Sequence, residues 1–262
     1  MKKLLTLSLV ILMALGISAQ ENAQPLYLLF EFMHVKSDKG NDYLQVEDFW
    51  SGIHKQRVAD KSIEGWDLWS LTPSGTEQGS QYLTVTVFSS LKDMLTAVES
   101  LDVMAYAKKA YPNKSEAELN EMFNKTGASR DMAHQVLFKE VAHTKDAFKM
   151  KVGTLATMDI MKQLDNSYEK VEEETFQPWH QKMVDAGKKG NWGLLEAILP
   201  AGSESYGTHM TVSMYNDVPQ MASFMEGSAG DPDLWNKPAV TEGLKTRQWK
   251  EVKIAKLEMM VR

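Results

Sequence analysis

The feature that most constrains the fold is a pattern that occurs twice in the chain. His54 is followed twelve residues later by Trp66, and His180 is followed twelve residues later by Trp192, so the copies lie 126 residues apart. The alignment continues on both sides of this pattern, where segment 42–47 matches 167–172 and segment 85–94 matches 212–221. A register that drifts so little indicates a unit of roughly 120 residues present twice.

Each copy is predicted to contain the same elements in the order strand, helix, strand, strand, helix, strand. Residues 26–35 are apolar and aromatic, as in a buried strand. Asp42 with Gln45 resembles a capping box and predicts a helix from residue 42 to about residue 58, and Ser115 with Glu118 forms a second box further on. This order is the split βαβ pattern of ferredoxin-like domains.

One such unit has a sheet with helices on one face, and its other face must be covered. Two units in tandem can cover each other. We therefore predict an α+β protein in which two tandem ferredoxin-like βαββαβ units pack sheet to sheet within one chain.

The first 19 residues are typical of a cleaved export signal, with two lysines, an apolar run at 4–15 and small residues at the cleavage point. A membrane anchor, the alternative, needs about 18 or more apolar residues, and this run is shorter. We expect an exported protein, periplasmic or secreted. Its parts are then a signal peptide at 1–19, a first ferredoxin-like unit at 20–145 and a second at 146–262.

The composition excludes several classes of function. The chain has no cysteine, so it has neither disulfides nor thiolate metal ligands nor a cysteine nucleophile. The formal net charge is −6, which argues against nucleic acid or an anionic membrane surface as a partner. The sequence contains no pair of histidines at metal-ligand spacing, no GxSxG motif and no phosphate-binding glycine loop. Metal-binding, hydrolase and nucleotide-binding functions therefore have no support. The 17 methionines are typical of gap-filling core residues, or of a pocket for an apolar ligand.

Three features carry a resemblance to a known family: Trp50-x-x-x-His54, Gly65-Trp66 at a strand start, and the strand ending VTVFSSLKDM. Together they resemble the NIPSNAP and EthD-like branch of the dimeric α+β barrel superfamily, once per unit over the whole mature chain. The superfamily includes haem-degrading and antibiotic-biosynthesis monooxygenases, chlorite dismutase-like haem proteins, isomerases and members without known activity. A shared fold does not fix which of these functions applies.

The resemblance implies a pocket within each unit, between the sheet and its helices. The candidate catalytic residues are then His54 and His180, and the candidate ligand-binding residues are Trp50, Trp66, Arg130, Trp179, Trp192 and Arg247. Each has a structural alternative. The histidines can be buried and bonded to backbone, the tryptophans can fill the core, and the arginines can pair with the helix carboxylates Glu47 and Glu172.

Two functions follow from this reading. The first is an exported protein that binds a small apolar or aromatic molecule, with a monooxygenase-like enzyme as its catalytic version. For that version the resemblance allows haem, although no residue pattern requires a cofactor and no metal site is predicted. The alternative is a non-catalytic binding or structural module. Neither nucleic acid nor, after signal cleavage, a membrane is expected as a partner, and self-association stays open.

Overall fold

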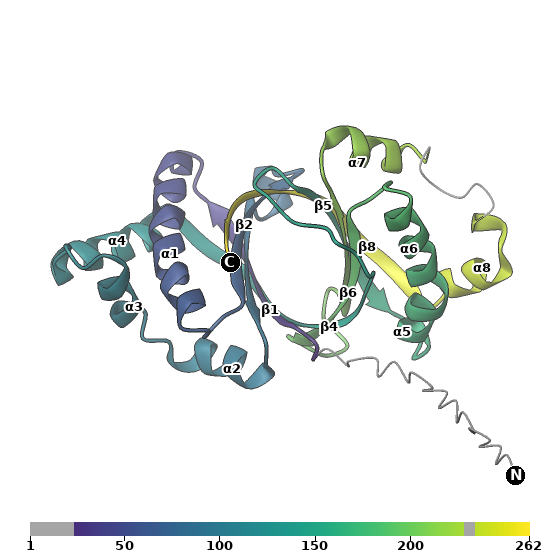
Figure 1. The fold of residues 1–262 in the computed structure, drawn as a ribbon, viewed down its shortest axis with the longest axis horizontal. Helices are drawn as coiled ribbons and strands as arrows, with labels where there is room; N and C mark the ends of the chain where they lie inside the picture. The colour runs from purple at the N-terminus through teal and green to yellow at the C-terminus, as the bar shows by residue number, and fades with distance from the viewer. Residues whose placement is uncertain (1–23, 228–233) are drawn as a thin grey trace, which may run out of the picture.

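The computed structural model describes residues 24–227 and 234–262, in which eight strands form one closed barrel with helices on two opposite sides (Figure 1). The predicted signal peptide, residues 1–19, lies outside the described residues. Within the described ranges, no helix is both long enough and apolar enough to cross a membrane.

The strands are β1 (Tyr27–Val35), β2 (Gly65–Thr72), β3 (Tyr82–Phe88), β4 (Arg130–His143), β5 (Leu155–Gln163), β6 (Asn191–Leu199), β7 (His209–Tyr215) and β8 (Arg247–Val261). The α-helices are α1 (Gly40–Ala59), α2 (Leu91–Ser100), α3 (Val103–Ala110), α4 (Glu116–Ser129), α5 (Tyr168–Val171), α6 (Gln177–Asp185), α7 (Val218–Met225) and α8 (Pro238–Leu244).

The barrel is one closed eight-stranded sheet with two four-stranded halves, and every strand pair in it is antiparallel. The strand order in the first half is β4-β1-β3-β2, and in the second half it is β8-β5-β7-β6, the ferredoxin-like order in both. Pairing of β2 with β8 and of β4 with β6 joins the halves into a ring. The predicted α+β class with two tandem ferredoxin-like units is therefore confirmed.

Successive side chains on each strand point alternately into the barrel and toward the helices. On β1, Phe30 and Phe32 belong to the apolar cluster inside the barrel, whereas Leu29 and Met33 belong to the cluster beneath the helices. Helices α1 to α4 cover the outer face of the first half, and α5 to α8 cover that of the second (Figure 1). Each half therefore has a layer of side chains between its sheet and its helices, separate from the side chains inside the barrel.

Helix α1 begins at Gly40, two residues before the predicted start. Its N-cap is Lys39, and no side chain caps it, so the predicted capping box at Asp42 and Gln45 is wrong. The Asp42 carboxylate instead pairs with the Lys39 ammonium at 3.1 Å, within the first turn. The second predicted capping box, Ser115 with Glu118, is confirmed at the start of α4.

The equivalent helix of the second half contains one turn of π-helix, Glu172–Phe176, between α5 and α6. A π turn takes up one residue more than an α turn without breaking the helix. Before this turn the two halves align at an offset of 125, and after it they align at 126. The π turn thus accounts for the change of register within the helix.

Candidate functional site

A cavity of about 550 Å³ lies in the first half, between the outer face of the sheet and the helices. We call it the first-half cavity. Four of the predicted site residues line it together: Trp50, His54, Trp66 and Arg130. Aliphatic and phenyl side chains from β1, β3, β4, α2, the segment after α2 and the start of α3 complete the lining, namely Leu29, Phe88, Met132, Ala97, Val98, Leu101 and Val103. A volume of this size accommodates a small organic ligand.

The His54 ring is held between two tryptophans. Its centroid lies 4.9 Å from that of Trp66, with the rings 14° from parallel, and 6.0 Å from that of Trp50. Trp50 and His54 are neighbours because residues four apart share one face of a helix. The Trp50 indole is fixed in turn, since its N–H donates to the Thr126 hydroxyl at 3.1 Å.

The protonation state of His54 follows from its neighbour Arg57, whose guanidinium lies 3.3 Å from Nδ1. A guanidinium can only donate, so Nδ1 accepts and the ring proton is on Nε2. Burial, aided by the charge of Arg57, lowers the pKa of His54 well below its ordinary value, so the ring is neutral. Among the described residues Nε2 has no hydrogen-bond partner, which leaves its N–H available to a ligand in the cavity that His54 lines.

An ion pair lies at another wall of the same cavity. Arg130 Nε donates to Glu47 Oε1 at 3.2 Å, so the expected pairing of this arginine with a helix carboxylate is confirmed. Glu47 is 1 % exposed, and burial raises the pKa of its carboxyl to about 7 although Arg130 opposes the shift. A carboxyl with such a pKa exchanges a proton readily at neutral pH.

The sequence reading missed a second carboxylate in this cavity, Glu31 on β1. It accepts hydrogen bonds from the Thr84 hydroxyl at 3.1 Å and from the Gln135 amide at 3.3 Å, and all three residues line the cavity. Glu31 is the one acidic residue in the otherwise apolar and aromatic segment 26–35. That interruption of a buried strand is the signal that would have identified it.

The second half repeats three of these contacts. His180 stacks on Trp192 with centroids 4.7 Å apart and rings 14° from parallel. Arg247 pairs with Glu172, both nearly fully buried, which again confirms the expected ion pair. On β5, Asp159 accepts from the Thr211 hydroxyl at 3.3 Å, as Glu31 does from Thr84.

Lys189 makes the two halves different. Its ammonium donates to His180 Nδ1 at 3.0 Å and to the Ser213 hydroxyl at 2.9 Å, and the residue is 2 % exposed. The ammonium also lies 4.0 Å from the ring centroid of Phe224. Burial lowers the pKa of Lys189 to about 7.

The repeat alignment shows which first-half residues correspond to Phe224 and to Ser213, the hydroxyl partner of Lys189. At the offset of 127 that relates β3 to β7, Ser213 corresponds to Thr86 and Phe224 to Ala97, and both first-half residues line the first-half cavity. In the second half the same region therefore contains a lysine side chain and a phenyl ring. Trp179, also predicted for the site, packs edge-on against His180 at 4.6 Å and against Phe224 at 6.0 Å.

The two stacked histidines do not fit an axial haem ligand. An iron-bound histidine donates its Nδ1 proton to an acceptor and uses the lone pair of Nε2. At His54 the cation Arg57 donates to Nδ1 and the proton is on Nε2, which is the opposite polarity. Across residues 24–227 and 234–262, no cluster of three histidine, aspartate or glutamate side chains could hold a metal ion.

Neither a protein-family model nor a curated protein matches this sequence. Solved structures do match its fold. A candidate monooxygenase from Fusobacterium nucleatum subsp. nucleatum ATCC 25586 is 9 % identical with a TM-score of 0.56, covering 91 % of this chain and 94 % of its own. An anthrone oxidase-like protein is 13 % identical with a TM-score of 0.53, covering 92 % and 94 %.

A third similar structure, a candidate chlorite dismutase, is 9 % identical with a TM-score of 0.52 and covers 90 % of this chain and 96 % of its own. At these identities the likeness concerns the fold alone. The chain has the fold of the dimeric α+β barrel proteins, with both halves of the barrel in one polypeptide.

Proposed function

We propose that this protein binds a small, largely aromatic molecule in the first-half cavity. The observation that carries the proposal is the difference between two equivalent places in the fold. The first half has a cavity of about 550 Å³ beside the stacked His54, and the second half has Lys189 and Phe224 there. Packing alone explains a histidine stacked on a tryptophan in both halves, but it does not explain open space beside His54 where the second half has the side chains of Lys189 and Phe224 beside His180.

The lining specifies the chemistry of the ligand. The wall formed by α2 and the start of α3, from Ala97 to Val103, is apolar and suits a hydrocarbon or aromatic body. The free Nε2–H of neutral His54 suits a keto, ether or phenolic oxygen. The carboxylates of Glu31 and Glu47 are matched in the lining by two arginines, so the cavity has no excess charge and favours a neutral ligand.

Oxygenation of this ligand without a cofactor is the catalytic version of the proposal. It is supported by the raised pKa of the Glu47 carboxyl, which suits a general base near neutral pH, and by similar structures named as monooxygenase or oxidase-like. Glu47 would take a proton from a CH₂ group next to a keto-stabilised ring system, and the carbanion would react with O₂. The CH₂ group becomes C=O, and the second oxygen atom leaves as water.

The test uses anthrone, a neutral tricyclic ketone with such a CH₂ group. Purified protein in aerated buffer should quench its tryptophan fluorescence on titration with anthrone, and should speed the appearance of anthraquinone. Glu47→Gln should abolish the acceleration while binding remains. Binding without acceleration in the wild type would support the non-catalytic binding module.

One substitution tests the site itself. Ala97→Phe gives the first half the ring that Phe224 supplies in the second, and should abolish anthrone binding. Thr96→Phe, on the exposed side of the same helix, is the matched control and should bind normally. Equal binding by both variants would overturn the proposal.

We further propose that the protein is exported, that its halves arose by tandem duplication, and that it belongs to the NIPSNAP and EthD-like branch. The basic and apolar segment at 1–19 supports export, and the repeated His-to-Trp spacing supports the other two. Mass spectrometry of the protein from its native host should find a mature chain that begins after Ala19. An intact Met1 in the cell interior would contradict export.

A further inference from the structure

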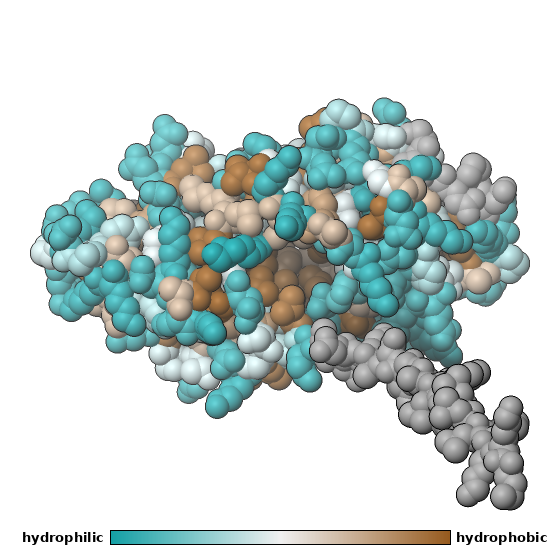
Figure 2. Space-filling view, viewed as in Figure 1, coloured by the Kyte–Doolittle hydropathy of each residue, from teal (hydrophilic) through white to brown (hydrophobic). Residues whose placement is uncertain are grey.

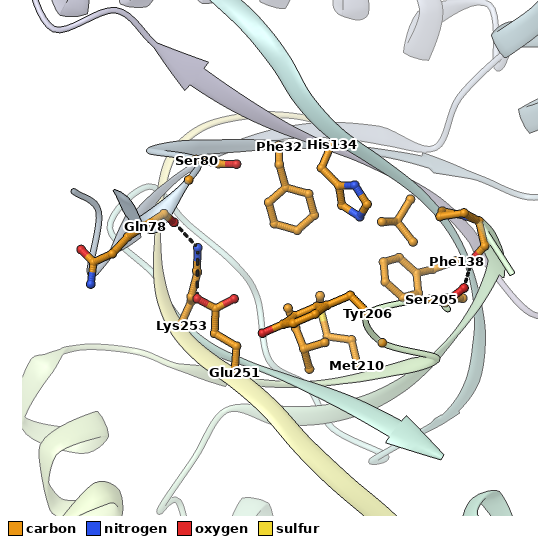
Figure 3. A pocket seen from close by; sticks show the side chains of 16 residues that line it. Phe32, Gln78, Ser80, His134, Phe138, Ser205, Tyr206, Met210, Glu251 and Lys253 are labelled. Carbon is orange, nitrogen blue, oxygen red and sulfur yellow. Dashed lines mark hydrogen bonds and ion pairs between the residues drawn. The ribbon is translucent and has the colours of Figure 1, made fainter. Parts of the chain in front are cut away.

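The inside of the barrel contains two cavities that the proposed function does not use. The smaller, about 260 Å³, lies toward one end, where side chains from several strands and from a loop point into it, among them Phe32, His134, Phe138 and Tyr206 (Figure 3). The larger, about 450 Å³, lies toward the other end, where β1 and β6 begin and β8 ends. We call the larger one the lumen cavity.

Two alanines create the space of the lumen cavity. Ala156 on β5 and Ala255 on β8 are cross-strand partners, both almost completely buried, and both line it. The residues around them are large, including Phe30, Trp69 and Leu195. The interior of an eight-stranded barrel is just wide enough to be filled by side chains or to hold one small ligand. Two small side chains next to each other on adjacent strands leave the interior unfilled at this point, which creates the cavity.

The groups at the mouth of the lumen cavity argue against a charged ligand. Arg262 pairs with Asp67 at 2.8 Å, and His143 lies 3.2 Å from the carboxylate of Glu140. These four residues and Glu64 line the mouth, so acidic groups outnumber basic ones and the one arginine is already paired. An anion would meet repulsion, and a cation would have to leave water for an apolar interior.

We infer that the lumen cavity is a second ligand site, separate from the first-half cavity, that takes a neutral apolar molecule. Figure 2 shows this face of the molecule hollowed where Figure 1 shows the barrel end-on, with hydrophobic residues inside the hollow. Met150, Met158 and Met214 line the cavity. Their unbranched side chains adapt to ligands of different shape, so the site discriminates between ligands by their polarity more than by their shape.

The test uses the neutral probe N-phenyl-1-naphthylamine with the full chain. The probe is itself neutral and aromatic, so both proteins compared carry Ala97→Phe, which fills the first-half cavity and leaves the lumen cavity to report. Probe fluorescence should rise on binding to the Ala97→Phe protein, which is the matched control. Adding Ala255→Leu, which fills the lumen cavity, should weaken this binding at least tenfold while the melting temperature holds or rises. If Ala255→Leu does not fold, the smaller change Ala156→Val carries the same test.

Unchanged probe binding in the folded lumen variant, or its loss in Ala97→Phe, would overturn the second site. The anionic relative 1-anilinonaphthalene-8-sulfonate tests the chemistry and should bind far more weakly than the neutral probe. Equal affinity for the two probes would contradict a neutral ligand. Failure of this site leaves the proposal for the first-half cavity untouched, because the two are blocked by different alanines.

Discussion

Replacing Lys189 by methionine should remove a pH dependence of stability that the wild-type protein shows between pH 7 and pH 9. Burial lowers the pKa of Lys189 from 10.5 to about 7 in the folded protein. Between these values the unfolded chain binds more protons than the folded one, so the free energy of unfolding rises with pH. From the two titration curves, the rise between pH 7 and pH 9 is about 2 kcal/mol.

The assay is urea denaturation followed by tryptophan fluorescence at pH 7, 8 and 9. Staying at or below pH 9 avoids the tyrosines, whose ordinary pKa is about 10. Methionine is one atom shorter than lysine, so it keeps most of the unbranched side chain near Phe224 but cannot titrate. We expect a rising wild-type curve, whereas the Lys189→Met curve should not rise and should fall slightly above pH 7 as the Glu47 carboxyl finishes titrating. A flat wild-type curve, or the same slope in both proteins, would show that the amine is not buried beside His180.

Three further outcomes are expected. Arg130→Met leaves the Glu47 carboxyl buried without its cation, so it should lower the free energy of unfolding by about 3–5 kcal/mol in urea titrations. Adding Glu47→Gln should recover part of this loss, and no recovery would argue against the ion pair. In α1, a side chain at Gly52 would overlap the hydroxyl and the Cζ atom of Tyr111, so Gly52→Ala should lower the free energy of unfolding by about 1–3 kcal/mol. Tyr111→Phe removes the hydroxyl and should relieve part of this loss, and an additive loss in the double variant would contradict the contact. Haemin added to the protein should keep its free spectrum, because His54 offers an N–H and not a lone pair; a sharpened Soret band lost in His54→Ala would refute that assignment.

The parts of the fold that sequence could predict are those that the repeat encodes. The spacing from His54 to Trp66 spans the end of a helix, a loop and the start of a strand, and any second copy of that geometry must reproduce it. The arginine–glutamate pairs were predictable for the same reason, since Arg130 and Arg247 each open the last strand of a half.

The asymmetry of the two halves could not be predicted in this way. Lys189 lies in a Lys-Lys-Gly turn that by composition belongs at the surface, yet its side chain turns inward to His180. The extra residue of the second helix is absorbed by a π turn, which no hydrophobic period announces. Both features depend on which side chain reaches the interior after the sheet and helices have packed. Composition and spacing do not contain that information.

Crystals soaked with a set of small aromatic ketones and phenols would test the central claim most directly. The account predicts electron density in the first-half cavity, in contact with His54 and bounded by Ala97. It predicts none between Lys189 and Phe224 in the second half. Density in the second-half position, or no occupancy of the first-half cavity by any compound of the set, would contradict it.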